Sequence, residues 1–254
     1  MSTKSPIKDL RFKNISLSLL KGLIEKDSIV NTYGLFSGNV EISLSLSDIK
    51  INAFTDKSVI YQFWHCLFEN NTRLYNILTD SSFKFRGIAE YNLLQEGLTH
   101  YKDAHYRSSL FFMLNRCSAT GQVSCGEFKP DDYNPMALNY LKTFEKPELF
   151  DIFYYQNSHE KLDDVNYILF HSLNFSYNLT DIGTTNSYDN YNFNSKKLRT
   201  LLNTQKDRKI IMIYNNHPGL FNFYKEYCLT MVNKYGHQTD DKKDCEEIIV
   251  TNFQ

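Results

Sequence analysis

The chain has 254 residues, enough for one large domain or two small ones with a substantial hydrophobic core. No run of 18 or more apolar residues occurs, which argues against a transmembrane helix, and the charged N-terminus lacks the apolar region of a signal peptide. The net charge of −1 gives no global argument for nucleic-acid binding. We therefore expect an intracellular protein of the cytoplasm or a virion, not a secreted one, with no membrane partner.

The first part of the chain alternates between helix and strand patterns. Apolar residues recur near the 3.6-residue period in residues 15–25 (ISLSLLKGLIE), which predicts a helix. Residues 31–46 (NTYGLFSGNVEISLSL) contain a short apolar segment, a Gly-containing turn and a second periodic stretch, which predict a strand, a loop and a helix. The alternation in residues 49–53 predicts another strand, and residues 59–68 (VIYQFWHCLF) read as a buried helix.

The second part of the chain contains a series of strand-like runs separated by polar or helical segments. Such alternation is typical of an α/β fold with a mainly parallel sheet. A helical block interrupts the pattern, so we expect an α/β core in residues 1–56 and 131–254 and a helical insertion in residues 57–130. The strand-like runs are residues 149–155 (LFDIFYY), 166–170 (NYILF), 209–214 (KIIMIY) and 246–253 (EEIIVTNF), and a helix is expected at residues 196–202.

Cysteine and histidine spacing gives no sign of a metal site or a disulfide framework. The five cysteines are an odd number and contain no Cys-x-x-Cys pair. The seven histidines show neither His-x-x-x-His nor Glu-x-x-His spacing on a helix. We therefore expect no bound metal.

One segment carries a family resemblance. Residues 108–128 (SSLFFMLNRCSATGQVSCGEF) form an apolar helix pattern that breaks off at Asn115 and passes through polar residues to Gly126. This resembles the segment of the Dam-type (D12 class) adenine-N6 DNA methyltransferases in which a helix reading like "alFlyLNrtcFNGL" leads through a polar hairpin to "GeFN". Further similar segments follow in the same order and spacing, so the resemblance covers nearly the whole chain: residues 91–98, 188–203, 209–224 and 246–253.

The resemblance implies a Rossmann-like methyltransferase sheet with a helical insertion that carries a β-hairpin. In that family the insertion and its hairpin contact DNA. Residues matching the hairpin would then supply two cationic phosphate contacts, Arg116 and Lys129, and a reader of base edges, Gln122. The alternative is an ordinary surface hairpin without a ligand.

The catalytic motif of the family is missing. The family holds a flipped adenine at an Asp-Pro-Pro-Tyr motif, whose carboxylate and proline carbonyl accept the amine hydrogens while the Tyr stacks on the base. The aligned residues here are His171, Ser172, Leu173 and Asn174. No proline occurs between Pro147 and Pro218, so a shift of register does not restore the motif. We expect no catalytic residue at this position.

The cofactor motifs are degenerate too. The family reads "EPFxGxG" after the first strand, where its backbone passes close to S-adenosylmethionine. Residues 33–40 (YGLFSGNV) keep Phe36 and Gly38 but place Val40 at the second glycine, where a β-branched side chain obstructs a close approach. The ribose-binding acid aligns with Phe54, and the nearest acid is Asp56, for which the alternative role is an N-cap of the following helix. Phe36, Gly38 and Asp56 are thus vestigial, and no cofactor is expected.

Taken with the resemblance, these departures predict a catalytically inactive homologue, a pseudoenzyme that acts through a surface. Its function would be DNA binding or protein interaction as a structural subunit, with a viral assembly or an active paralogue as the partner. Abundant Phe and Tyr and scarce Pro and Gly, typical of AT-rich genomes, favour a viral or phage source. The alternative is an active S-adenosylmethionine-dependent adenine-N6 DNA methyltransferase with divergent motifs.

Overall fold

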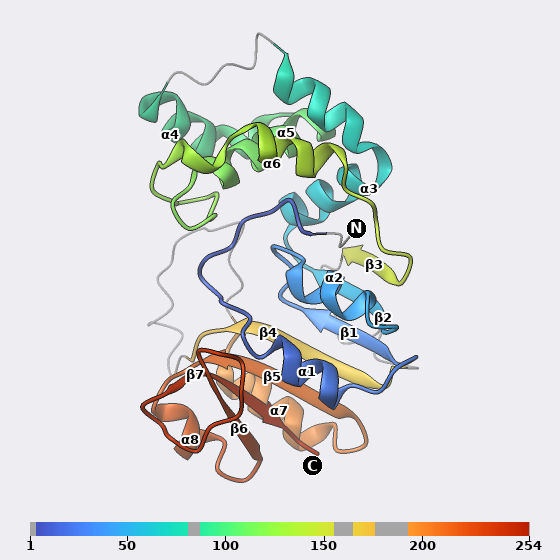
Figure 1. The fold of residues 1–254 in the computed structure, drawn as a ribbon, viewed down its shortest axis with the longest axis vertical. Coiled ribbons are helices and arrows are strands. Elements are labelled where there is room, and N and C mark those ends of the chain that lie inside the picture. Colours follow the sequence, from blue (N-terminus) through green and yellow to red (C-terminus); the bar gives the residue numbers. More distant parts are fainter. Residues whose placement is uncertain (1–3, 81–86, 155–164, 176–192, 254) are drawn as a thin grey trace.

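The computed structural model describes residues 4–80, 87–154, 165–175 and 193–253 (Figure 1). Within them, seven strands form one sheet in the order β3-β2-β1-β4-β5-β7-β6. Neighbours from β3 to β5 are parallel, whereas β7 is antiparallel to both β5 and β6. The fold is therefore a mainly parallel, Rossmann-like α/β fold, as expected. The strands are β1 (Ile29–Tyr33), β2 (Lys50–Thr55), β3 (Phe150–Tyr154), β4 (Tyr167–Leu173), β5 (Lys209–Asn215), β6 (Cys228–Asn233) and β7 (Cys245–Thr251).

Both faces of the sheet are buried, because side chains alternate between two apolar cores. Val30 and Ile51 belong to the core on the side of α1 (Leu17–Leu23), α2 (Asn39–Ser45) and α3 (Ser58–Thr79). Tyr33 and Phe54 point to the other core, which includes residues of α7 (Ser195–Thr204) and α8 (Gly219–Phe223). Figure 1 shows α1 and α7 on opposite sides of β5.

In the described residues, the connection between β2 and β3 is mostly helical. In Figure 1 they form a separate layer beyond α2, at the end of the molecule opposite β6. α3 packs on α5 and α6, and α5 is buried on nearly all sides. Because α6 belongs to this layer, the helical part continues past residue 130 before β3 begins. The further elements are α4 (Ile88–Gly97), η1 (Leu98–His100), α5 (Ala104–Cys117), η2 (Pro130–Asp132) and α6 (Pro135–Lys142).

The strands predicted at residues 149–155, 166–170, 209–214 and 246–253 are confirmed within the described residues as β3, β4, β5 and β7. Tyr155 and residues 188–192, part of one segment that carried the resemblance, lie outside the described residues. β6 was not predicted. It is the last strand of the sheet, with side chains that are mostly half-buried, so its sequence lacks a strong apolar pattern. No helix in the described part is long and apolar enough to cross a membrane.

Candidate functional site

The strand order reverses between β1 and β4, and in open α/β sheets ligands bind outside the carboxyl ends of the strands at such a point. Two backbone segments meet there: the loop after β1, starting at Gly34, and the end of β4, at His171. Gly34 has φ +114°, and a Cβ atom added to it would lie 2.7 Å from the carbonyl oxygen of His171. The two segments are therefore in direct backbone contact.

A buried pair ties the same two segments together. Nε2 of His171 lies 2.7 Å from Oε1 of Glu41 on α2, and the side chains are 4% and 0% exposed. Thr32 Oγ1 donates to the same carboxylate oxygen at 3.2 Å, whereas Oε2 has no hydrogen-bond partner among the described residues. Burial alone would raise the pKa of the Glu41 carboxyl, but the charge and hydrogen bond of His171 outweigh it, and the pKa is lowered.

The loop after β1 is packed against α3. Leu35 is fully buried and Phe36 is 3% exposed. The Trp64 indole Nε1 donates to the Phe36 carbonyl at 3.0 Å. Gly38 has φ +69°, and a Cβ there would lie 2.5 Å from the Trp64 ring. Phe36 and Gly38, the two residues kept from the cofactor motif, thus have packing roles in this fold.

On the other face of the sheet, four aromatic rings stack across the carboxyl ends of four strands. They run from Phe153 on β3 through Phe54 on β2 and Tyr33 on β1 to Phe170 on β4, with centroid separations of 5.2, 5.4 and 4.9 Å. Burial raises the pKa of the Tyr33 hydroxyl to about 12. Phe54, at the position of the ribose-binding acid, is one member of this row.

Asp56 is exposed, and it does not cap α3. The N-cap residue is Lys57, without a side-chain hydrogen bond, and the Lys57 N–H donates instead to Thr55 Oγ1 at 3.1 Å. The expectation that Asp56 serves as the N-cap is therefore wrong.

The remaining residues aligned with the catalytic motif differ in their surroundings. Ser172 has φ +58°, a conformation uncommon for a residue with a side chain, and the pairing of β4 with β5 is irregular there. Leu173 is buried, while Asn174 is exposed. Asn174 Oδ1 accepts a hydrogen bond from Asn215 Nδ2 at the end of β5, at 2.9 Å.

The polar hairpin after α5 is present, and it holds the N-terminal segment. Ser118 and Phe128 form an antiparallel bridge, so the expected hairpin is confirmed. Asn115 Nδ2 donates to the Lys8 carbonyl at 2.8 Å, and its Oδ1 accepts from the Lys8 N–H at 2.9 Å. The Leu10 N–H donates to the Thr120 carbonyl at 2.9 Å. Polar groups of the hairpin are thus used within the chain.

The three residues predicted to contact DNA are placed differently from one another. Arg116 Nη2 donates to the Pro6 carbonyl, its guanidinium lies 5.7 Å from the Phe112 ring centroid, and burial lowers its pKa. Gln122 is half-buried and Lys129 is exposed. Arg116 therefore faces the N-terminal segment, and Lys129 is the most accessible of the three.

No protein-family model matches this chain, and no curated protein matches it either. The resemblance to the Dam-type methyltransferases therefore depends on the motifs quoted above. In the described part of the chain, no three His, Cys, Asp or Glu side chains are grouped so that they could hold a metal ion. All five cysteines are free.

Sequence reasoning missed Glu41 and Lys8, which are both buried and polar. A signal for Glu41 was present, because it is the lone charged residue of α2 and stands between Val40 and Ile42, and a buried acid needs a partner. No comparable signal marked Lys8. Its Nζ donates to the Ser118 carbonyl at 2.8 Å and to Asp132, contacts between segments far apart in the sequence.

Proposed function

We propose that this chain is a catalytically inactive relative of the Dam-type adenine-N6 DNA methyltransferases and works as a protein-interaction or structural subunit. The observation that carries the proposal is the backbone contact between Gly34 and His171. In the methyltransferases that the chain resembles, the loop after β1 borders the methyl donor and the end of β4 holds the adenine. Donor and acceptor would have to meet between them.

Three features reinforce the contact. The Glu41–His171 pair is fully buried, so separating the segments would expose a charged group or leave it unpaired. Phe54 belongs to a stacked row of rings where the ribose-binding acid would be. His171 uses Nε2 for Glu41 and Nδ1 for Ser172 Oγ, at 3.0 Å, so both ring nitrogens are engaged inside the protein. Together these features favour a scaffold without methyl transfer.

A protein partner is the first candidate, with a viral assembly or an active paralogue as its source. At the end of α5, just before the hairpin that would contact DNA, Asn115 and Arg116 are directed toward residues 6–8. DNA is the second candidate partner, favoured by the exposed position of Lys129 beside the hairpin.

Calorimetric titration with S-adenosylmethionine tests the proposal. We expect no heat of binding at concentrations up to about 1 mM, the range of the weakest specific complexes. A methyl-transfer assay on adenine-containing oligonucleotides with the same sample should give no product. Micromolar binding together with product formation that is abolished in His171→Ala would contradict the proposal and restore the active enzyme.

A further inference from the structure

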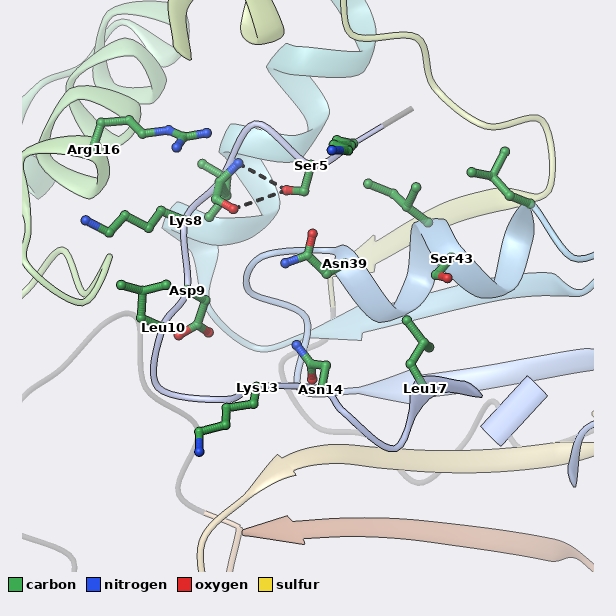
Figure 2. Close-up of a pocket in the computed structure, with 14 residues that line it drawn as sticks. Ser5, Lys8, Asp9, Leu10, Lys13, Asn14, Leu17, Asn39, Ser43 and Arg116 are labelled. Carbon is green, nitrogen blue, oxygen red and sulfur yellow. Dashed lines mark hydrogen bonds between the residues drawn. The ribbon is translucent and has the colours of Figure 1, made fainter. Parts of the chain in front are cut away.

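A groove runs along the N-terminal segment, beside the loop that follows β1. Its volume is about 540 Å³, and it is bordered by residues 4–17, the outer side of α2 and the end of α5. Figure 2 shows Arg116, Lys8 and Lys13 along one side, Ser43 and Leu17 along the other, and Asn39 and Asn14 between them. We propose that this groove binds an extended, acidic segment of a partner protein that carries leucine-like side chains.

Charge favours an acidic occupant. The groove is lined by four cationic side chains and by one carboxylate, Asp9. Both oxygens of Asp9 accept from Arg11, at 2.9 and 3.1 Å, which neutralises the acid. The ion pair of Lys13 with Glu246 is 62% and 40% exposed, so solvent screens it and Lys13 remains available to another anion. The four cations are Lys4, Lys8, Lys13 and Arg116. Lys8 is paired with Asp132 and Arg116 donates to the Pro6 carbonyl, so Lys4 and Lys13 are the cations that an acidic occupant would meet.

Exposed leucines favour a peptide over a nucleic-acid backbone. Leu10 and Leu46, both lining the groove, are 65% and 53% exposed, while Ile7 and Ile42 beneath them are 3% exposed each. Burying exposed apolar side chains against an apolar group of a partner is favourable. A phosphate backbone would use the cations and leave the leucines in water.

The main chain of the segment favours an extended conformation of the occupant. Residues 4–14 lie in neither a helix nor a strand. Lys13 and Asn14 are among the lining residues, and their N–H groups donate to no acceptor in the described part of the chain. An extended peptide supplies carbonyl acceptors along its length, as in strand addition to an open edge.

The inference rests on the proposed function as an interaction subunit, and fluorescence anisotropy with the full chain tests it. The probe is a short fluorescein-labelled peptide of alternating Glu and Leu. We expect saturable binding, with versions that replace Glu by Lys or Leu by Ser at least about tenfold weaker. No saturable binding below about 1 mM would overturn the inference.

Matched variants locate the site. Leu46→Gln, and separately Leu10→Gln, should weaken the Glu–Leu peptide about tenfold, whereas Leu93→Gln, at a leucine that is 69% exposed on α4, should not. The double variant Lys4→Glu/Lys13→Glu should also weaken the Glu–Leu peptide about tenfold. The control Lys206→Glu/Lys225→Glu changes the net charge equally and should not weaken it. Unchanged binding in both leucine variants would place the peptide elsewhere and overturn the inference.

Two further measurements separate the possible failures. A labelled oligonucleotide that binds more tightly than the peptide and is indifferent to Leu46→Gln would identify a nucleic-acid surface and overturn the peptide groove. Titration of the same samples with S-adenosylmethionine tests the proposed function alone. Micromolar cofactor binding with methyl transfer to the oligonucleotide, alongside intact peptide binding, would refute the pseudoenzyme and leave the groove standing.

Discussion

The carboxyl edge of the sheet and the N-terminal groove differ in how their polar groups are used. At the carboxyl edge, Gly34 touches the backbone of His171, and the Glu41–His171 pair is sealed from solvent. In the groove, Lys13 and Leu10 are exposed, and the ion pair of Lys13 with Glu246 is open to water. Side chains at the carboxyl edge are thus engaged with one another away from solvent, while the irregular N-terminal segment presents exposed ones.

The comparison shows where an interaction surface can lie under the proposed function. In a chain without methyl transfer, residues at the carboxyl edge need not stay apart for a ligand, and packing them together stabilises the fold. The polar hairpin then has a new use, because Asn115 fixes the N-terminal segment that forms one wall of the groove. The predictions below test whether one region is closed and the other held open.

The largest effect is expected from breaking the Glu41–His171 pair. His171→Ala removes one member and leaves the buried Glu41 carboxylate uncompensated, so the free energy of unfolding should fall by about 3–5 kcal/mol. Urea denaturation measures this loss. His65→Ala, at an exposed histidine of α3, is the control and should change the free energy of unfolding by less than about 0.5 kcal/mol.

The pH dependence of the same pair has a definite sign. The folded-state pKa of Glu41 is lowered, so its contribution is complete above the ordinary value of 4.5 and is lost as the pH falls through the folded-state pKa. Glu41→Gln should therefore flatten the acid limb of the stability profile below pH 4.5. An unchanged acid limb would mean that Glu41 is not held as a carboxylate.

The backbone contact is tested by Gly34→Ala. The added Cβ meets the His171 carbonyl at 2.7 Å, and φ +114° disfavours any side chain, so we expect a loss of about 1–3 kcal/mol in the free energy of unfolding. Gly22→Ala is the control, because nothing lies within 4 Å of its Cβ position on α1. That change should be neutral or stabilising by about 0.5–1 kcal/mol. A harmless Gly34→Ala would show that the cleft is open.

Much of the fold is predictable from local patterns, and the site is not. β4 and β5 follow from continuous apolar runs, because a parallel strand that is buried on both faces needs apolar residues throughout. Residues 31–46 likewise predict a strand, a loop and a helix, and that helix is α2. The signal there is helical periodicity. β6 is not predicted, because its side chains are mostly half-buried and its sequence has no continuous apolar run.

The site depends on contacts that no local pattern contains. The alignment placed His171 at a lost catalytic position, but its partner Glu41 is 130 residues away and was unmarked. Likewise, the position of Arg116 at the end of a helix predicts an exposed side chain. In the structure, the direction of its guanidinium is set by the Pro6 carbonyl and the Phe112 ring. Long-range pairing decides whether a charged side chain faces a ligand or the protein interior.

The hairpin's hold on the groove wall is tested by Asn115→Ala. The change removes both hydrogen bonds to the Lys8 backbone and leaves buried main-chain groups unpaired, so we expect a loss of about 1–2 kcal/mol. Hydrogen exchange of residues 7–10 should accelerate, and the Glu–Leu peptide should bind more weakly. Asn76→Ala, an exposed position on α3, is the control and should change neither property. Unaltered exchange in Asn115→Ala would mean that the segment is fixed by other contacts.

The smallest effect separates the two residues expected to bind phosphate. If the hairpin contacts DNA, Lys129→Ala should reduce the slope of log affinity against log salt by about 1, because one exposed cation no longer displaces a counterion. Arg116→Ala should leave that slope unchanged, since its guanidinium is engaged with the Pro6 carbonyl, and should instead lower stability. Gel shifts at several salt concentrations measure both, with Lys206→Ala as the control. Equal reductions by the two variants would mean that Arg116 turns outward to DNA, and the hairpin would then be a binding surface and not only the support of the groove.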